Sequence, residues 1–196
     1  MVVVMQTCTG PIRLHVNRKW EEVQNMIDAL GTKLLYFIII VQHGVKGFLF
    51  GGGSGGVIGI PILFLLKSYT GSSQLKATQI QIYKTVALTP WALKSLIGMI
   101  TDTVYIGGYN KVPYLFGTMI YSVLSCIVLA SAWPLDPGLV TCLLFFMFLG
   151  CALPDLLTEA KYSEKISRCP EYGPDITVFV WTGIFACQIL STVLIG

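Results

Sequence analysis

The chain has 196 residues, of which 54% are hydrophobic and only 12% are charged, and its mean hydropathy is +0.72. Soluble domains carry about a quarter charged residues, and a single core of this size is too small to bury so much apolar surface. The composition therefore predicts an integral membrane protein whose partner is the lipid bilayer. The net charge of +3 is small and scattered along the chain, which excludes nucleic acid as an expected partner.

The cysteines and histidines do not form a pattern typical of a metal centre, a cofactor site or a disulfide framework. The sequence has no CxxC pair, and neither His15 nor His43 stands close to a group of cysteines. Cys126, Cys142 and Cys151 fall within apolar runs, where cysteine acts as a small hydrophobe. The HExxH motif of zinc proteases is absent as well. We expect no metal, no cofactor and no enzymatic activity.

The first 33 residues are the longest stretch with an aqueous character. Within it, apolar side chains recur at helical spacing opposite charged ones, at Trp20, Val23, Ile27 and Leu30. This pattern favours an amphipathic helix that lies against the membrane or against other helices. We therefore expect residues 1–33 to form a cytoplasmic N-terminal segment that precedes a transmembrane region over residues 34–196.

The rest of the chain contains apolar runs of roughly the 20 residues that cross a bilayer. They predict an all-α membrane protein with about five transmembrane helices, near residues 34–66, 80–100, 112–132, 139–157 and 176–196. The first run is too long for one simple crossing, and Lys46 and a glycine-rich stretch at 51–56 interrupt it. It predicts either one long tilted helix or an interfacial turn followed by a crossing.

Positive charge near the ends of these runs predicts the orientation of the helices. Most of the basic residues lie before the first span or after the second and fourth, which are positions on one side of the membrane: Arg13, Arg18, Lys19, Lys33, Lys111, Lys161, Lys165 and Arg168. The opposite side carries Lys67 and Lys76. Because basic loops stay in the cytoplasm, we expect the N-terminus, residues 101–111 and residues 161–174 to be cytoplasmic. Residues 67–76 and 133–138 are then on the outside.

Glycines in the first apolar run are spaced for close helix packing. Gly47, Gly51, Gly55 and Gly59 recur every four residues, which would place them on one face of a continuous helix. An alternative is that the helix bends or gates there, since glycine weakens a helix interior. The formal GxGxxG match in this stretch does not indicate a nucleotide site, because no strand precedes it in a βαβ unit.

Charged residues inside the apolar runs are the candidate functional residues, because a charge in hydrocarbon costs several kcal/mol. Lys46 lies in the first run, Lys94 deep in the second and Asp155 near the end of the fourth. Glu159 is one helical turn beyond Asp155, close enough to the cytoplasmic end to be simply solvated. Trp91 follows Pro90 in mid-span and falls on one helical line with Lys84, Ser95 and Gly98, a face that suits either a cavity or a proline-kinked packing interface.

Two stretches resemble the folate–biopterin (pteridine) transporter family of the major facilitator superfamily. Residues 89–115 match its pattern between helices two and three, at Pro90, Trp91, Lys94, Gly98, Asp102, Gly108, Tyr109, Lys111, Pro113 and Tyr114. Residues 151–164 match its fourth-helix pattern, at Asp155, Glu159, Ala160 and Glu164. Ser95 stands where a proline is common, Glu159 where Asp is usual, and a basic pair is reduced to Asn110-Lys111. These departures resemble divergence within the family, toward the pteridine transporters of trypanosomatid parasites.

The resemblance implies the N-terminal part of an alternating-access carrier for folate, biopterin or a related pterin, with protons as the coupling ion and the plasma membrane as its location. A pterin would give paired hydrogen bonds to Asp155 and stack on Trp91, and the glutamate tail of folate would bind Lys94 or Lys46. Gly98, Asp102, Gly108, Lys111 and Pro113 would belong to the cytoplasmic gate.

Two six-helix halves make up the superfamily fold, so about five helices would form part of the N-terminal half and would need the C-terminal helices or other chains. The alternative is a truncated membrane fragment that does not transport, or a membrane protein that binds other subunits.

Overall fold

The computed structural model describes residues 20–21, 23–28, 30–51, 55–72, 75–109, 111–131 and 135–195, and these residues form helices and short connections. In these ranges the only β interaction is an isolated bridge between Ile106 and Tyr109. The prediction of an all-α protein is therefore confirmed. Several residues used in the sequence argument, among them Arg13, Arg18, Lys19, Gly53 and Asn110, lie outside the described residues.

The described part of residues 20–30 is helical and rests on the helices that follow. Met26 and Leu30 are buried against Ile38 and against side chains near the C-terminus, including Ile176 and Val180. Trp20 and Val23, which belong to the predicted apolar stripe, are exposed. The helix thus contacts the bundle through the face that carries Met26 and Leu30.

The first apolar run consists of two helical pieces separated by a break. The α-helix α2 (Thr32–Ile38) continues directly into η1 (Ile39–Leu49), a π-helix, and α3 (Gly56–Ser72) follows after the break. The two glycines at the edges of the break, Gly51 and Gly56, have φ angles of +50° and +72°, a conformation that side chains with a Cβ rarely adopt. The run is therefore neither one long helix nor an interfacial turn followed by one crossing, because its first piece, Thr32–Leu49, is itself long and apolar enough to cross a membrane.

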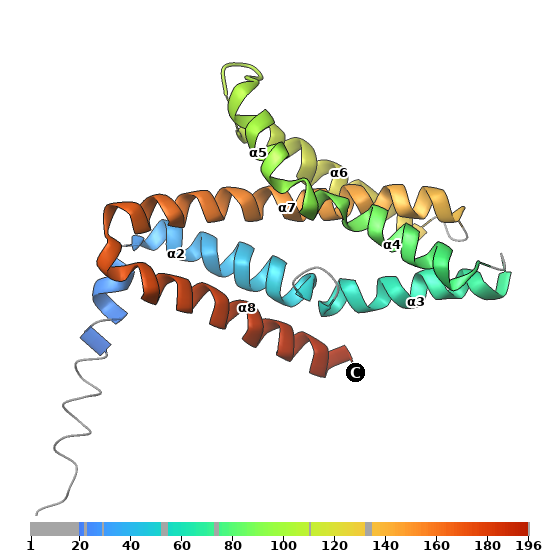
Figure 1. Cartoon of the computed structure of the whole chain (residues 1–196), viewed down its shortest axis with the longest axis horizontal. Coiled ribbons are helices and arrows are strands. Elements are labelled where there is room, and N and C mark those ends of the chain that lie inside the picture. The colour runs from blue at the N-terminus through green and yellow to red at the C-terminus, as the bar shows by residue number, and fades with distance from the viewer. Residues whose placement is uncertain are drawn as a thin grey trace, which may run out of the picture.

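The second apolar run is bent rather than straight. The helix α4 (Ala77–Ala92) ends at Leu93, and α5 (Lys94–Thr103) begins immediately afterwards in a different direction (Figure 1). Pro90, in the last turn of α4, lacks an N–H, and its ring crowds the carbonyl one turn earlier, which accounts for a bend at this point. The bend places Lys94 at the first residue of a new helix.

A tight turn joins α5 to α6 (Val112–Ser131). Ile106 and Tyr109 exchange both backbone hydrogen bonds, at 3.0 and 3.1 Å, across Gly107 and Gly108. The φ angles of these glycines are +61° and +81°. A positive φ at both central residues defines a type I′ turn, which explains why two glycines stand together here.

The next helix, α7 (Pro137–Arg168), is longer than the predicted span over residues 139–157. Asp136 caps it by accepting a hydrogen bond from the Gly138 N–H at 2.9 Å. Its 32 residues reach about 48 Å, well beyond the roughly 30 Å of a hydrocarbon core. The final turns are polar and carry ion pairs from Glu164 to Lys161 and Arg168. The short 3₁₀ turn η3 (Pro170–Tyr172) then leads into α8 (Gly173–Ile195).

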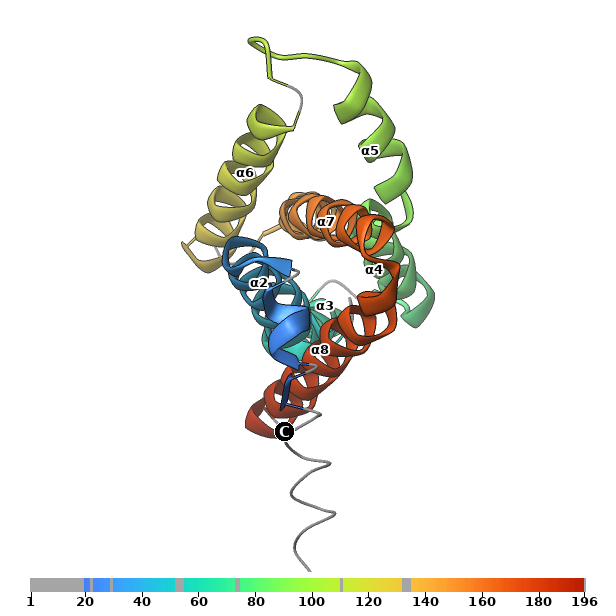
Figure 2. The ribbon, with the colours of Figure 1, turned by 90° about the vertical axis from the view of Figure 1, so that its left-hand side faces the viewer.

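The helix α7 lies at the centre of the bundle. It contacts α4, α5, α6, α8, α2 and η1, and α8 packs along η1. In the end-on view α5 and α6 diverge on either side of α7, while α2 and α8 lie together below it (Figure 2). One apolar cluster joins Phe50 and Leu66 to Val140, Leu144 and Phe148 of α7. The polar site described below lies on the same central helix.

Within the described ranges, four helical segments are long and apolar enough to cross a membrane: Thr32–Leu49, Val112–Ser131, Pro137–Arg168 and Pro170–Ile195. The apolar piece Gly56–Ser68 is shorter. Many large apolar side chains of α6 and α8 are exposed, among them Phe116, Ile120, Phe185 and Val193. Exposed apolar side chains in such number are typical of helices that face lipid or further helices.

Candidate functional site: a buried charge cluster

Asp155 of α7 is completely buried, and three side chains from two other elements surround its carboxylate. One carboxylate oxygen, Oδ1, accepts a hydrogen bond from Gln42 Nε2 at 2.7 Å and lies 3.0 Å from Lys46 Nζ. The other, Oδ2, lies 2.5 Å from Lys94 Nζ. Asp155 is 0% exposed, so these contacts replace the water that the charge loses on burial.

Glu159, one turn further along α7, belongs to the same site. Its carboxylate lies 3.2 Å from Lys46 Nζ and 2.5 Å from Lys94 Nζ. The expectation that Glu159 is simply solvated is therefore wrong, although its side chain is 33% exposed. Because α7 stays helical beyond the predicted end of the span, Glu159 keeps the same face as Asp155, and the two lysines lie between the two acids.

We call Lys46, Lys94, Asp155 and Glu159 the charge cluster. Its two positive and two negative side chains balance formally, and each lysine contacts both acids. This arrangement removes the repulsion that two carboxylates one turn apart would otherwise have. The cluster connects η1, α5 and α7 at a buried point of the bundle. Three of the residues predicted to bind substrate, Lys46, Lys94 and Asp155, are thus brought together.

The fourth predicted residue, Trp91, borders the cluster. The Nζ atoms of Lys46 and Lys94 lie 5.8 and 6.0 Å from the centroid of its ring. On another side Lys46 lies 5.5 Å from the ring of Trp181 on α8. Such distances allow cation–π attraction, which adds about 0.5–2 kcal/mol per pair. The site therefore combines charges with aromatic surfaces.

Local backbone features position these side chains. Gln42 and Lys46 project from the π-helix η1, a rare conformation that is often found at functional sites. Lys94 follows the break at Leu93 directly. In α7, Pro154 precedes Asp155, and the Thr158 hydroxyl donates to the Pro154 carbonyl at 2.7 Å. Each partner of the carboxylate thus comes from an irregular part of the backbone.

Three buried polar atoms have no hydrogen-bond partner among the described residues: Gln42 Oε1, Trp91 Nε1 and His43 Nε2. Buried polar atoms are nearly always paired, so each of these needs an explanation. Two of them, on Gln42 and Trp91, belong to side chains that border the charge cluster. The third belongs to a separate hollow.

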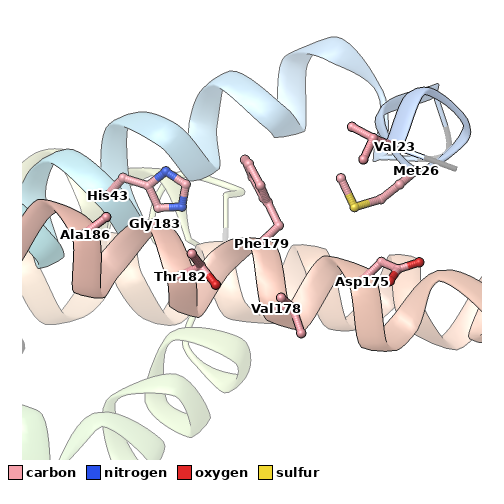
Figure 3. A pocket seen from close by; sticks show the side chains of 9 residues that line it. All are labelled: Val23, Met26, His43, Asp175, Val178, Phe179, Thr182, Gly183 and Ala186. Carbon is pink, nitrogen blue, oxygen red and sulfur yellow. The ribbon is translucent and has the colours of Figure 1, made fainter. Parts of the chain in front are cut away.

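That hollow has a volume of about 500 Å³ and lies between the N-terminal helix, η1 and α8 (Figure 3). Val23, Met26 and Phe179 line it, and His43 contacts the edge of the Phe179 ring at a centroid distance of 5.1 Å. Gly183 lies directly against the His43 ring and leaves no room for a Cβ. The walls are mainly apolar, with Asp175 on one of them.

The predicted gating residues lie toward the other end of α5. Asp102 and Lys111 form an ion pair of 2.8 Å across the turn, and both side chains are substantially exposed. A Cβ at Gly98 would contact the Leu156 side chain at 3.1 Å, so α5 approaches α7 closely there. Gly108 sits in the turn, and Pro113 is the second residue of α6. The turn with its ion pair thus lies at the opposite end of α5 from Lys94, whereas Gly98 stands one helical turn from Lys94 and packs on Leu156, next to Asp155.

The four regularly spaced glycines do not share one helical face, because the helix breaks between Phe50 and Gly56. A Cβ at Gly47 would lie 2.8 Å from the Ile184 carbonyl oxygen, and one at Gly55 would lie 3.2 Å from Gln188 Nε2, so both positions adjoin α8. Gly51 has a positive φ, and a Cβ there would collide with Gly56 and lie 3.5 Å from the Gln188 side chain, so this position adjoins α8 as well, while Gly59 is buried in α3. The four glycines therefore do not form the single continuous helical face that their spacing predicts.

Sequence reasoning missed three members of the site: Gln42, Glu159 and Trp181. Gln42 stands one turn before Lys46 in an apolar run, which was a usable signal for a shared polar face. Glu159 follows Asp155 by four residues, and a longer helical span would have kept both acids inside the bundle. Trp181 gave no local signal, because its role depends on the packing of α8 against η1.

Comparison with known proteins agrees with this architecture. The apolar helices define a multi-pass membrane protein. The chain belongs to the BT1 family, whose model matches residues 56–196. The resemblance to folate–biopterin transporters drawn from the sequence is thereby confirmed.

Two curated relatives from Arabidopsis thaliana are similar to the chain. Probable folate-biopterin transporter 4 is 31% identical over 130 residues, which cover 63% of this chain and 26% of the relative. Probable folate-biopterin transporter 6 is 23% identical over 154 residues, or 79% of this chain and 29% of the relative. The chain therefore spans less than a third of the length of these relatives. No solved structure matches the chain significantly.

Proposed function

We propose that the chain forms part of a membrane carrier that transports pteridines, such as folate or biopterin. The observation that carries the proposal is the charge cluster, in which Asp155 is fully buried between two lysines inside the helix bundle. Ionisable side chains within membrane-spanning helices are costly and commonly mark the path of a substrate or ion. The names of the curated relatives support pteridines as the substrate class.

The chemistry of the cluster fits such a substrate. A carboxylate like that of Asp155 can accept a hydrogen bond from the amino group of a pterin. The flat ring can stack on Trp91, and the glutamate tail of folate can bind a lysine. Because the positive and negative charges of the cluster are equal in number, a charged group of the substrate can replace one side chain as the partner of another. No buried charge is then left without a partner.

Transport itself would follow from rocking of two halves around this site, with further helices supplied by the rest of the carrier. In this proposal Asp155 also accepts and releases the coupling proton. The exposed pair of Asp102 and Lys111 latches the cytoplasmic side and separates when the gate moves. We place the carrier in the plasma membrane.

The test is uptake by cells that express the full-length carrier and lack pterin uptake of their own. Labelled biopterin and folate should accumulate faster than in cells with an empty vector, and excess unlabelled pterin should compete. Surface biotinylation shows whether the carrier reaches the plasma membrane. A carrier that reaches the surface and takes up neither compound would contradict the proposal and favour a membrane subunit that binds other chains.

A further inference from the structure

Gln42 and Trp91 each present a buried polar atom without a partner beside the charge cluster. We propose that these two atoms recognise the uncharged amide edge of the substrate. Gln42 Oε1 accepts a hydrogen bond from a ring N–H, and Trp91 Nε1 donates one to a carbonyl oxygen or ring nitrogen. The inference rests on the proposed function and narrows its ligand to a planar heterocycle that carries a donor and an acceptor.

The orientation of the Gln42 amide follows from its partner. An ionised carboxylate only accepts hydrogen bonds, so the group within 2.7 Å of Asp155 Oδ1 must be the Gln42 NH₂. The carbonyl oxygen of the amide then points elsewhere, and Gln42 is 0% exposed. An acceptor that is buried in this way loses its hydrogen bond to water and gains none within the described residues.

Trp91 supplies the complementary group. Its indole nitrogen is a donor only, and it is buried without an acceptor among the described residues. Its ring contacts the ammonium groups of both lysines, so the N–H at the ring edge remains available for a ligand. Both side chains belong to the surroundings of Lys46, whose Nζ lies 3.0 Å from the Asp155 oxygen that Gln42 binds and 5.8 Å from the centroid of the Trp91 ring.

One unpaired acceptor and one unpaired donor on side chains that border the same charge cluster fit a ligand with the opposite pair. A cyclic amide offers this pair on adjacent atoms, an N–H and a C=O, and the oxo-bearing ring of a pterin contains it. A site that leaves such atoms unpaired when the ligand lacks the matching group discriminates strongly against that ligand. Gln42 and Trp91 therefore determine specificity, whereas the charge cluster supplies charge recognition.

Competition against labelled biopterin uptake by the full-length carrier tests this inference. The competitors are a pterin, the same ring without its oxo group, and the same ring with its amide N–H methylated. Wild type should prefer the pterin over either analogue by about tenfold, the effect of one buried hydrogen bond. Trp91→Phe keeps an aromatic face and should lose the preference against the analogue without oxygen. Gln42→Leu should lose the preference against the methylated analogue.

Trp20→Phe is the matched control, since Trp20 lies in the N-terminal helix and is 63% exposed. It should keep the selectivity of the wild type. Trp91→Phe is the conservative variant, so its result stands if Gln42→Leu fails to fold. Should both variants take up pterin with unchanged selectivity, the unpaired atoms bind water and the inference is wrong. If wild type neither transports nor binds pterins, measured by quenching of tryptophan fluorescence in the purified carrier, the proposed function fails and this inference with it.

Discussion

Lys94 Nζ lies 2.5 Å from Asp155 Oδ2, although the two residues are 61 positions apart in the chain. Lys94 is the first residue of α5, directly after the break at Leu93, whereas Asp155 is buried in the long central helix. The contact therefore attaches the bent second helix to the centre of the bundle. Any change of the bend between α4 and α5 has to break this ion pair or move Asp155 together with Lys94.

The first prediction concerns the charge balance of the cluster. Lys94→Met leaves a net negative charge in a mostly buried site and should lower stability by roughly 3–5 kcal/mol. The double variant Lys94→Met/Asp155→Leu leaves Lys46 and Glu159 as a balanced pair. We expect it to be more stable than the sum of its single variants by about 0.5–3 kcal/mol. Thermal unfolding of the full-length carrier in detergent measures this cycle, and strictly additive effects would contradict the coupling.

The second prediction separates the two acids of α7. Glu159→Gln removes one partner of both lysines, but its side chain is 33% exposed, so water screens the loss. We expect its uptake rate to fall by a few-fold, less than after replacement of Asp155. Glu164→Gln is the matched control, because Glu164 lies on the same helix and pairs only with exposed Lys161 and Arg168. Equal uptake by Glu159→Gln and Glu164→Gln would mean that Glu159 contributes nothing to the site.

The third prediction concerns the close approach of η1 and α8. A methyl group at Gly47 would lie 2.8 Å from the backbone carbonyl of Ile184, which a change of rotamer cannot relieve. Gly47→Ala should therefore destabilise the carrier by about 1–3 kcal/mol. Gly117→Ala in α6 is the control, since among the described residues no atom beyond its own stretch of helix lies within 4 Å of the new Cβ, and it should be neutral or slightly stabilising. Similar melting temperatures for both variants would argue against tight packing at Gly47.

The fourth prediction is the orientation in the membrane, which remains a prediction from positive charge. Lys76 and Tyr109 are both exposed and lie on opposite predicted sides. In a carrier without its native cysteines, Lys76→Cys should react with an impermeant maleimide in intact cells. Tyr109→Cys should react only after permeabilisation. If Tyr109→Cys reacts in intact cells and Lys76→Cys reacts only after permeabilisation, the predicted orientation is wrong.

The helices and the charged residues of the site could be predicted from the sequence, because both are visible in the local composition of the chain. Long apolar runs predict helices, and a lysine or an aspartate within them stands out by its cost in hydrocarbon. Lys46, Lys94, Trp91 and Asp155 were identified in this way, and the structure brings them together.

The sequence left open whether the helix breaks after Phe50, and it did not predict the role of Glu159, since both depend on tertiary packing. The spacing of the glycines fits a continuous helix as well as an interrupted one, and only the positive φ angles of Gly51 and Gly56 distinguish the two. Glu159 looks like a solvated residue at the end of an apolar run. It joins the site because α7 continues as a helix and because two lysines from other helices reach it.

The most direct test of the central proposal is uptake of labelled biopterin by the full-length carrier with Asp155→Asn. Asparagine keeps the size of the side chain and part of its hydrogen bonding but removes the charge that both lysines contact. Initial rates, normalised to carrier at the cell surface, should fall by about tenfold or more. Removing one partner of a buried ion pair leaves the other charges uncompensated, at a cost of several kcal/mol. Normal uptake at both acid and neutral pH would show that Asp155 is structural and would contradict the proposed substrate site.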